Sequence, residues 1–149
     1  MFLDAIVGSL ASWEWLGQLL ARASVGLLFF LSGRGKLFVP ARRAQMRETI
    51  RDAGLPRPEL TAPVMSSIEF TCGAMLCLGL LTPVACVLLI GVMLGALVTT
   101  QIPRIKAASA LDWLADFLYL PEVLYLVMLL WLLFAGPGWF SLDRVLRAA

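Results

Sequence analysis

Four long apolar stretches dominate the chain, separated by shorter polar segments. They cover roughly residues 15–33, 61–81, 84–101 and 121–140. A helix that crosses a bilayer needs about 20 predominantly apolar residues, so each stretch predicts a transmembrane helix. Residues 1–13 read as an interfacial segment that leads into the first helix. We therefore expect an all-α integral membrane protein, a single domain over residues 1–149 that forms a four-transmembrane-helix bundle with short interfacial helices.

Two of the polar connections carry helical patterns of their own. Residues 41–53 place apolar side chains on one face and arginines on another, a pattern typical of a short basic helix on an anionic membrane surface. Residues 107–120 place leucines on one face and aspartates on another, which predicts an in-plane or re-entrant helix before the fourth span. Ser141 suits the N-cap of a last short helix.

Glycines recur along the faces of three predicted spans. Small residues let membrane helices approach closely, so these positions predict packing surfaces and not a functional site. The glycines in question are Gly26 and Gly33 on the first span, Gly73 on the second, and Gly91 and Gly95 on the third.

The composition agrees with a membrane protein. Of the 149 residues, 60% are hydrophobic and 15% are charged, whereas soluble domains have about 45–50% apolar and about 25% charged residues. The mean hydropathy is +0.88. The lipid bilayer is the expected partner, and no nucleic-acid partner is expected because the basic cluster is small and lies beside the membrane. The sequence contains no histidine, which excludes haem or zinc held by histidine, and no metal site is expected.

Lysine and arginine are concentrated on one side of the predicted bundle. The opposite side has only Arg144 and Arg147, in the tail. The positive-inside rule then places the first and third connections in the cytoplasm and both termini outside. The first and third connections hold Arg34, Lys36, Arg42, Arg43, Arg47, Arg51, Arg57, Arg104 and Lys106.

Arg22 and Glu69 lie inside the first and second spans. Inserting a charge near the bilayer centre costs about 2.5 to 3.5 kcal/mol of free energy, so such a residue usually has a charged or polar partner or a functional role. Arg22 lies roughly 12 Å and Glu69 roughly 19 Å from the outer ends of their helices, at about 1.5 Å per residue. An arginine side chain can bridge that gap, and we expect an ion pair. Such a pair either fixes helix register or forms a polar floor for a ligand headgroup or a proton.

Glu122 begins the fourth span and is expected at the depth of Arg34 and Lys36. Pairing among these three residues would leave a charged cluster at the cytoplasmic mouth of the bundle, with snorkelling to water as the structural alternative.

The three cysteines, Cys72, Cys77 and Cys86, form no C-x-x-C pair. Buried cysteine commonly behaves as a small hydrophobe, and we expect that role here. A thiol or redox role is the alternative.

The last span ends in a distinctive string, Gly136-Pro137-Gly138-Trp139-Phe140-Ser141-Leu142-Asp143. Further short motifs precede it along the chain. They are Arg22 with Gly26, Leu31-Ser32-Gly33-x-Gly35-Lys36-Leu37, Gly54-Leu55-Pro56, Ile68-Glu69, Leu78-Gly79-Leu80-Leu81-Thr82 and Glu122. In this combination the chain resembles the DoxX family of small four-helix bacterial membrane proteins, whose last span typically closes in G-P-G-x-x-S-L-D.

One departure from the family pattern concerns the end of the third span. Members often carry a histidine there, where this chain has Gln101-Ile102-Pro103. The role of that histidine therefore does not carry over, and Gln101 stands as the candidate at that position.

The resemblance implies a bacterial inner-membrane location, and in that membrane the charge bias described above places both termini on the periplasmic side. Some members are subunits of thiosulfate:quinone oxidoreductases or are associated with quinol oxidases, and others look like scaffolds. The chain has no nucleotide-binding glycine fingerprint, no haem-attachment motif and no cysteine framework for an iron–sulfur cluster. It is therefore not expected to be catalytic alone, and no covalently bound cofactor is expected. A quinone from the bilayer or a partner subunit would supply any redox chemistry.

Three hypotheses follow for the function. The first is an accessory membrane subunit of a quinone-linked redox complex with a quinone-headgroup pocket, in which Arg22 donates hydrogen bonds and Glu69 handles a proton. The second is a small proton-coupled transporter that uses Glu69, for which a homodimer would suit. The third is a ligand-free scaffold that recruits partner proteins. The candidate ligand-binding or proton-relay residues are Arg22, Glu69, Glu122, Lys36 and Gln101, with no catalytic residue assigned.

Overall fold

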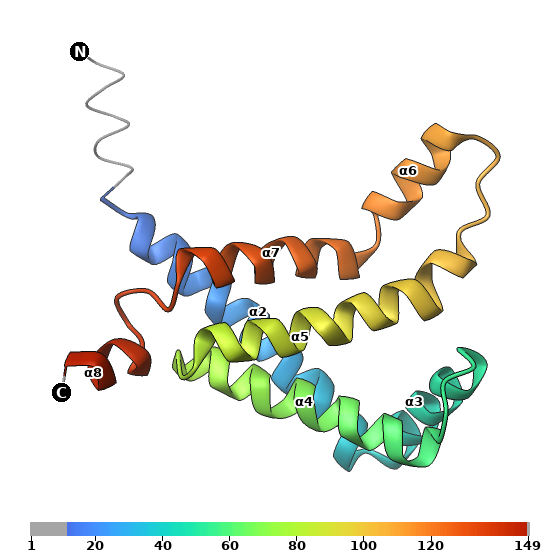
Figure 1. The fold of residues 1–149 in the computed structure, drawn as a ribbon, viewed down its shortest axis with the longest axis horizontal. Coiled ribbons are helices and arrows are strands. Elements are labelled where there is room, and N and C mark those ends of the chain that lie inside the picture. Colours follow the sequence, from blue (N-terminus) through green and yellow to red (C-terminus); the bar gives the residue numbers. More distant parts are fainter. Residues whose placement is uncertain (1–11, 149) are drawn as a thin grey trace.

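The structure, a computed structural model, describes residues 12–148 and consists of helices joined by short connections (Figure 1). The segment expected at the membrane interface, residues 1–13, lies almost wholly outside this range. No strand occurs within the described range. The helices are α2 (Glu14–Phe38), α3 (Pro40–Asp52), α4 (Pro58–Leu78), α5 (Thr82–Ala96), η1 (Leu97–Gln101), η2 (Ile102–Arg104), α6 (Ala110–Leu118), α7 (Pro121–Ala135) and α8 (Leu142–Ala148).

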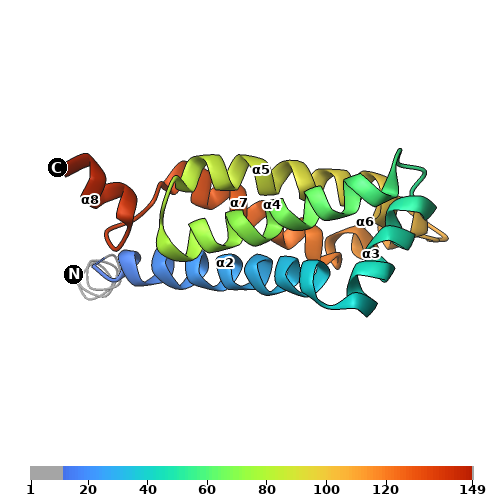
Figure 2. The same cartoon turned by 90° about the horizontal axis from the view of Figure 1, so that it is seen from below.

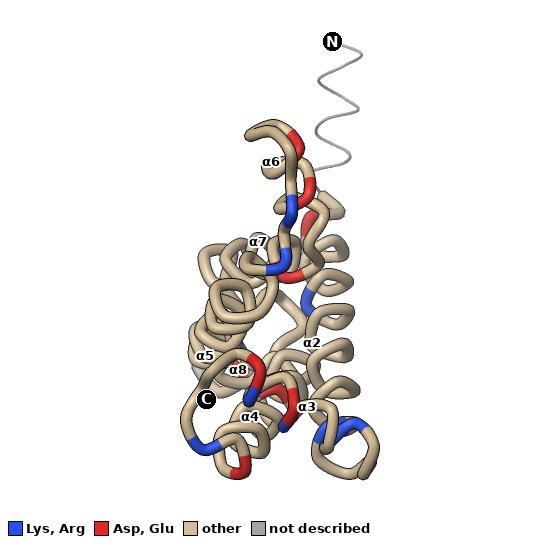
Figure 3. Tube along the Cα trace, turned by 90° about the vertical axis from the view of Figure 1, so that its right-hand side faces the viewer, with Lys and Arg blue, Asp and Glu red and all other residues tan. Residues whose placement is uncertain are grey.

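The four longest stretches of helix, α2, α4, α5 and α7, lie side by side along the length of the molecule (Figure 2). One end holds α8, the start of α2 and the turn between α4 and α5, and is called here the tail end. The other end, called the α3 end, holds α3 and α6. Charged residues lie mainly in the short helices and connections, and the long helices are largely free of them (Figure 3).

The first three spans are confirmed as helices long and apolar enough to cross a membrane. They run over Glu14–Phe38, Pro58–Leu78 and Thr82–Arg104, the last comprising α5, η1 and η2. The fold is thus an all-α membrane protein, as the sequence predicts. The first helix extends past Gly33, where the sequence analysis ended it. This extension keeps Lys36 on the helix, a position that matters for the site below.

The fourth span differs from the prediction of a continuous helix over residues 121–140. Helix α7 ends at Ala135, and its length of about 22 Å, at about 1.5 Å per residue, falls short of a hydrocarbon core of about 30 Å. Helices α6 and α7 meet at a bend of 61° and form a fourth span only if the pair is taken together. Gly136, with φ of +81°, ends α7 because that conformation is not helical.

The two helices expected in the connections are both present. Helix α3 (Pro40–Asp52) packs onto the bundle by burying Ile50. An ion pair of 2.8 Å between Arg47 Nη1 and Glu59 Oε2 links it to α4, and Arg43 donates to the Leu37 carbonyl at the end of α2. Helix α6 (Ala110–Leu118) buries none of its residues and begins at the N-cap Ser109. The basic helix is therefore held against the bundle by contacts within the protein.

Helices α2 and α4 approach each other most closely at glycines, as predicted. A β-carbon added to Gly33 would lie 2.4 Å from the Phe70 nitrogen, and one added to Gly73 would lie 2.3 Å from the Phe30 nitrogen. No real side chain tolerates such distances without movement of the backbone. These glycines therefore set the separation of the first two spans.

The glycine pair on the third span does not behave in the predicted way. A β-carbon at Gly91 would meet no atom within 4 Å, and one at Gly95 would touch only the end of Met65 at 3.9 Å. No helix packs closely on this pair in the described part of the chain. Spacing alone cannot distinguish a packed glycine pair from one that faces a cavity or lipid.

The difference between these glycines yields a stability prediction. Gly33→Ala should lower the stability of the folded bundle by about 1–3 kcal/mol, because α2 and α4 would have to separate. Gly91→Ala is the matched control, since its new methyl group meets open space and alanine favours the helix. Thermal unfolding in a mild detergent measures both. Equal melting temperatures for the two variants would contradict the close approach.

Candidate functional site

Arg22 lies at the tail end of the bundle and does not pair with Glu69, which corrects the expected ion pair. Its side chain is 2% exposed. The guanidinium donates through Nη1 to the Pro137 carbonyl and through Nη2 to the Phe140 carbonyl. Backbone carbonyls thus satisfy the buried charge.

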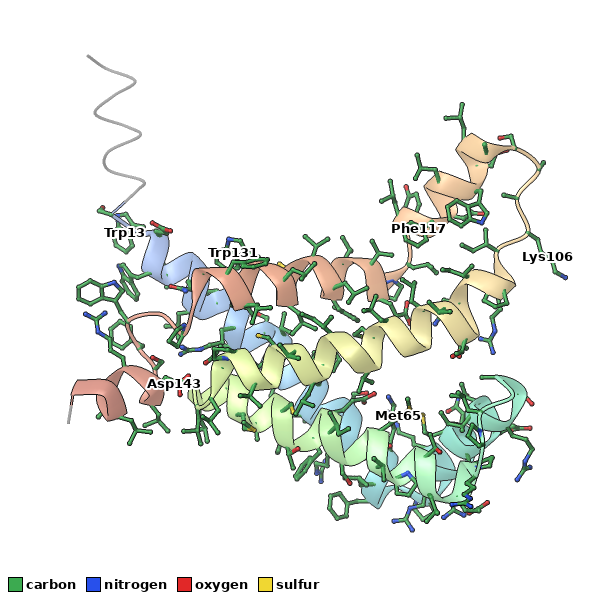
Figure 4. The ribbon with its side chains drawn as sticks, in the orientation of Figure 1. Trp13, Met65, Lys106, Phe117, Trp131 and Asp143 are labelled. Carbon is green, nitrogen blue, oxygen red and sulfur yellow. The ribbon has the colours of Figure 1, made fainter. Side chains whose placement is uncertain are left out.

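Asp143 completes this tail-end contact from the first turn of α8. Its carboxylate accepts hydrogen bonds from the backbone nitrogens of Leu81 at 2.6 Å and Thr82 at 2.8 Å. Its own nitrogen donates to the Gly79 carbonyl at 2.9 Å. Figure 4 shows Asp143 beside the turn between α4 and α5. The carboxylate caps the start of α5, where the helix dipole favours a negative charge.

The tail-end contacts, called here the tail clamp, give the closing string of the last span a structural role. Gln18 strengthens the clamp by donating from Nε2 to the carbonyls of Ala135 at 3.1 Å and Gly136 at 2.9 Å. Ser141 caps α8, as predicted, by accepting from the Arg144 nitrogen at 3.3 Å. The clamp joins α2, the α4–α5 turn and the tail. Both Nη nitrogens of Arg22 donate within it, and the buried Nε has no hydrogen-bond partner in the described structure.

Glu69 instead pairs with Lys36 in the half of the bundle towards the α3 end. Lys36 Nζ lies 2.7 Å from both carboxylate oxygens, and Ser32 Oγ donates to Oε2 at 3.0 Å. The Glu69 side chain is 2% exposed and that of Lys36 is 27% exposed. Both partners, Ser32 and Lys36, lie on α2 one turn apart, because that helix continues to Phe38.

Glu122 pairs with Gln101 and not with Arg34 or Lys36, so the expected cluster of these three is wrong. Gln101 Nε2 donates to Glu122 Oε1 at 2.6 Å. The second oxygen, Oε2, is buried and has no hydrogen-bond partner in the described structure. Gln101 ends η1, a short π-helix, and such π-helical segments occur frequently at functional sites.

A cavity of about 510 Å³ joins these two polar pairs. Ligand pockets are typically about 300–1,000 Å³, mostly apolar with a few polar groups. Figure 4 shows Met65, on α4, at the space between α4 and α5. The cavity is lined by Ser32, Lys36, Arg42, Gln45, Met46, Thr49, Ile50, Leu55, Met65, Glu69, Val92, Met93, Gly95, Ala96, Thr99, Thr100, Gln101 and Glu122.

The structure thus brings together four of the five candidate residues named from the sequence. Lys36, Glu69, Gln101 and Glu122 line the cavity, and Arg22 does not. Sequence reasoning missed the contribution of α3, whose residues form one wall. The sequence does contain a signal for this contribution. Residues 41–53 have an apolar face, and such a face packs either on a membrane or on the rest of the protein.

The cysteines line no part of this cavity. Cys72 and Cys86 are buried in the hydrophobic core, as expected of small apolar side chains, and Cys77 is exposed. No group of metal-ligating side chains occurs among the described residues.

Comparison with known proteins gives a family match and a relative. The family model described as DoxX matches residues 17–102. The protein named "Uncharacterized membrane protein Rv3486" from Mycobacterium tuberculosis (strain ATCC 25618 / H37Rv) is 33% identical over 152 aligned residues, which cover 94% of this chain and 92% of that protein. No solved structure matches the chain.

The tail clamp predicts how the tail responds to loss of Arg22. Arg22→Met should release residues 136–148 from the bundle, because the carbonyls of Pro137 and Phe140 lose their donor. Trypsin should then cleave after Arg144 faster than in the unaltered protein, as followed by mass spectrometry in detergent. Arg34→Met, an exposed position on the same helix, is the control and should cleave at the unaltered rate. Equal cleavage in both variants would argue against the clamp.

Proposed function

The chain belongs to the DoxX family, and from this membership and the cavity we propose that it is an accessory membrane subunit of a quinone-linked redox complex, such as one that oxidises thiosulfate. The cavity holds the quinone headgroup. The proposal rests on one observation. Four polar residues, from three α-helices and one π-helix, converge on a cavity whose remaining walls are largely apolar. They are Lys36, Glu69, Gln101 and Glu122. A headgroup is itself an apolar ring with polar oxygens at opposite edges.

The polar pairs suit such a ring in position and in chemistry. The Lys36 ammonium has three protons and directs its hydrogen bonds at Glu69, which leaves capacity for a ligand oxygen. Glu122, in the first turn of α7, supplies the second polar group of the cavity. The donor role expected for Arg22 passes to Lys36 in this proposal, since Arg22 belongs to the tail clamp.

The chain acts with partners and not as a redox enzyme alone. Its sequence supplies no binding motif for a flavin, haem or iron–sulfur cluster. Electrons would therefore reach or leave the quinone through a partner subunit of the complex. The role of this chain is to bind the headgroup, exclude water and hold protonatable carboxylates beside it.

A proton-coupled transporter is the second candidate, favoured by one specific observation. Two carboxylates, Glu69 and Glu122, face one cavity, and membrane carboxylates commonly mark proton pathways. The two functions separate in liposomes. Proton-coupled uptake of a solute that Glu69→Gln abolishes would support transport, whereas a quinone-binding subunit moves no solute.

Quinone binding is the direct test of the first proposal. The full chain in lipid nanodiscs should bind ubiquinone-1 or a short-chain menaquinone, as measured by equilibrium dialysis. Lys36→Met should weaken binding by about tenfold or more, since a hydrogen bond from a charged group contributes about 1.5–3 kcal/mol. Glu69→Gln should also weaken it by leaving Lys36 differently oriented.

Glu48→Gln is the matched control for the glutamate change. Glu48 is exposed on α3 and does not line the cavity. The quinone affinity of this variant should therefore equal that of the unaltered protein. Melting temperatures of all variants show whether they fold. Folded variants that all bind as the unaltered protein does, or an unaltered protein that binds no quinone, would contradict the proposal and favour a ligand-free scaffold.

We also propose that both termini face the periplasm of a bacterial inner membrane. The α3 end carries most of the basic residues, and α8 and the start of α2 lie together at the tail end (Figure 3; Figure 2). Positive connections stay in the cytoplasm. In a chain whose three native cysteines are replaced by serine, a membrane-impermeant maleimide should label Ala149→Cys in spheroplasts, and should label Glu48→Cys only after lysis. The reverse pattern would place the α3 end outside.

A further inference from the structure

The hydroxyl groups in the cavity wall have already used their protons within the protein. Ser32 Oγ donates to Glu69 Oε2 at 3.0 Å, and Thr49 Oγ1 donates to the Gln45 carbonyl at 3.0 Å. A hydroxyl has one proton and two lone pairs. Towards a ligand, these two side chains can therefore act as acceptors only.

The two threonines of η1 behave in the same way. Thr99 Oγ1 donates to the Gly95 carbonyl at 2.7 Å. Its single proton is then used, so in the 3.3 Å contact between Thr99 and Thr100 the donor is Thr100. Both hydroxyl protons stay within the segment that lines the cavity.

Glu122 presents the strongest unused acceptor. The Gln101 amide donates to Oε1, and Oε2 is buried without a partner in the part of the chain that the structure describes. Glu122 lies in the first turn of α7, where the helix dipole favours a negative charge. A buried acceptor left unpaired costs about 1–3 kcal/mol, and more if it is charged.

Donors are scarce by comparison. Lys36 is directed at both oxygens of Glu69, which leaves it one proton at most. Gln101 Nε2 keeps one proton after its bond to Glu122 Oε1. Arg42 and Gln45 are exposed at the α3 side of the cavity, where water competes for their donors. The interior therefore holds more free acceptors than free donors.

From this imbalance we infer that the cavity selects the reduced, hydroxyl-bearing quinol over the quinone, with Glu122 Oε2 accepting the hydrogen bond of one quinol hydroxyl. This inference rests on the proposed function. A quinol hydroxyl supplies the donor that Glu122 lacks. A quinone carbonyl at the same place would bring two hydrogen-bond acceptors together. They would repel each other, and the carboxylate would stay unpaired. Sites built for a hydroxyl discriminate strongly against a ligand without it.

The preference is one of binding, and it requires no bond to form or break in this chain. It has a measurable electrochemical consequence. Tighter binding of the reduced form raises the midpoint potential of the bound couple by about 30 mV for each tenfold difference in affinity of a two-electron couple. The bound quinol would then be a weaker reductant than quinol in the bilayer, and it would be held until a partner subunit accepts its electrons.

The experiment compares ubiquinol-1 with ubiquinone-1 on the full chain in nanodiscs, under anaerobic conditions, by equilibrium dialysis. The unaltered protein should bind the quinol at least tenfold more tightly. In Glu122→Gln the new amide can direct its nitrogen at the ligand, so the quinol should lose affinity about tenfold while the quinone keeps or gains affinity. Glu48→Gln, on the exposed face of α3, should retain the preference.

The outcomes separate the inference from the proposed function. Equal affinity of the two forms for the unaltered protein overturns the inference and leaves the quinone pocket in place. An equal loss for both forms in a folded Glu122→Gln also overturns it, because that variant would only have disturbed the cavity. If neither form binds the unaltered protein, both the inference and the proposed function fail. The ratio for the unaltered protein is decisive even if the variant does not fold.

Discussion

The need to neutralise charge inside an apolar bundle determines how this chain is arranged. Arg22 and Glu69 are each 2% exposed, and a buried charge without partners would cost several kcal/mol. The two charges are satisfied separately, at different depths. Arg22 takes backbone carbonyls from the tail, and Glu69 takes Lys36 and Ser32 from α2. The first solution fixes the tail on the bundle, and the second fixes α2 against α4 beside a cavity.

The cavity exists because three neighbouring features leave space next to the Lys36–Glu69 pair. Close approach of α2 and α4 at Gly33 and Gly73 holds that pair in one wall. The π-helix of η1 widens the end of α5 and turns Gln101 towards α7. Helix α3 covers the remaining side and is tied to α4 through Arg47 and Glu59. Each feature is local, and the polar site arises only where they meet.

The sequence could predict the spans, the interfacial helices and four of the residues in the site, because burial of apolar area and the cost of charge act through residue type. It could not predict the partners. The rise per residue gives the depth of Arg22 along its helix, but it does not give the direction in which the side chain points. The groups that Arg22 contacts are backbone carbonyls, which every residue has. The predicted first span ends at residue 33, whereas α2 continues to Phe38 and Gly33 is packed within it. The break in the fourth span depends on the bend between α6 and α7, which no residue spacing specifies.

The closing string and the cavity lie at opposite ends of the bundle, so they carry different information. The string serves the tail clamp through Asp143, whose carboxylate caps α5, and it therefore identifies the architecture and not the ligand. The chemistry must be read from the cavity residues, where this chain has Gln101 at a position that often holds histidine in proteins it resembles. A side-chain amide does not act as an acid or a base near neutral pH, but it can hold a carboxylate in place by a hydrogen bond. Gln101 thus holds Glu122 in place, and in the proposed function any proton exchange with a ligand would fall to the carboxylate itself.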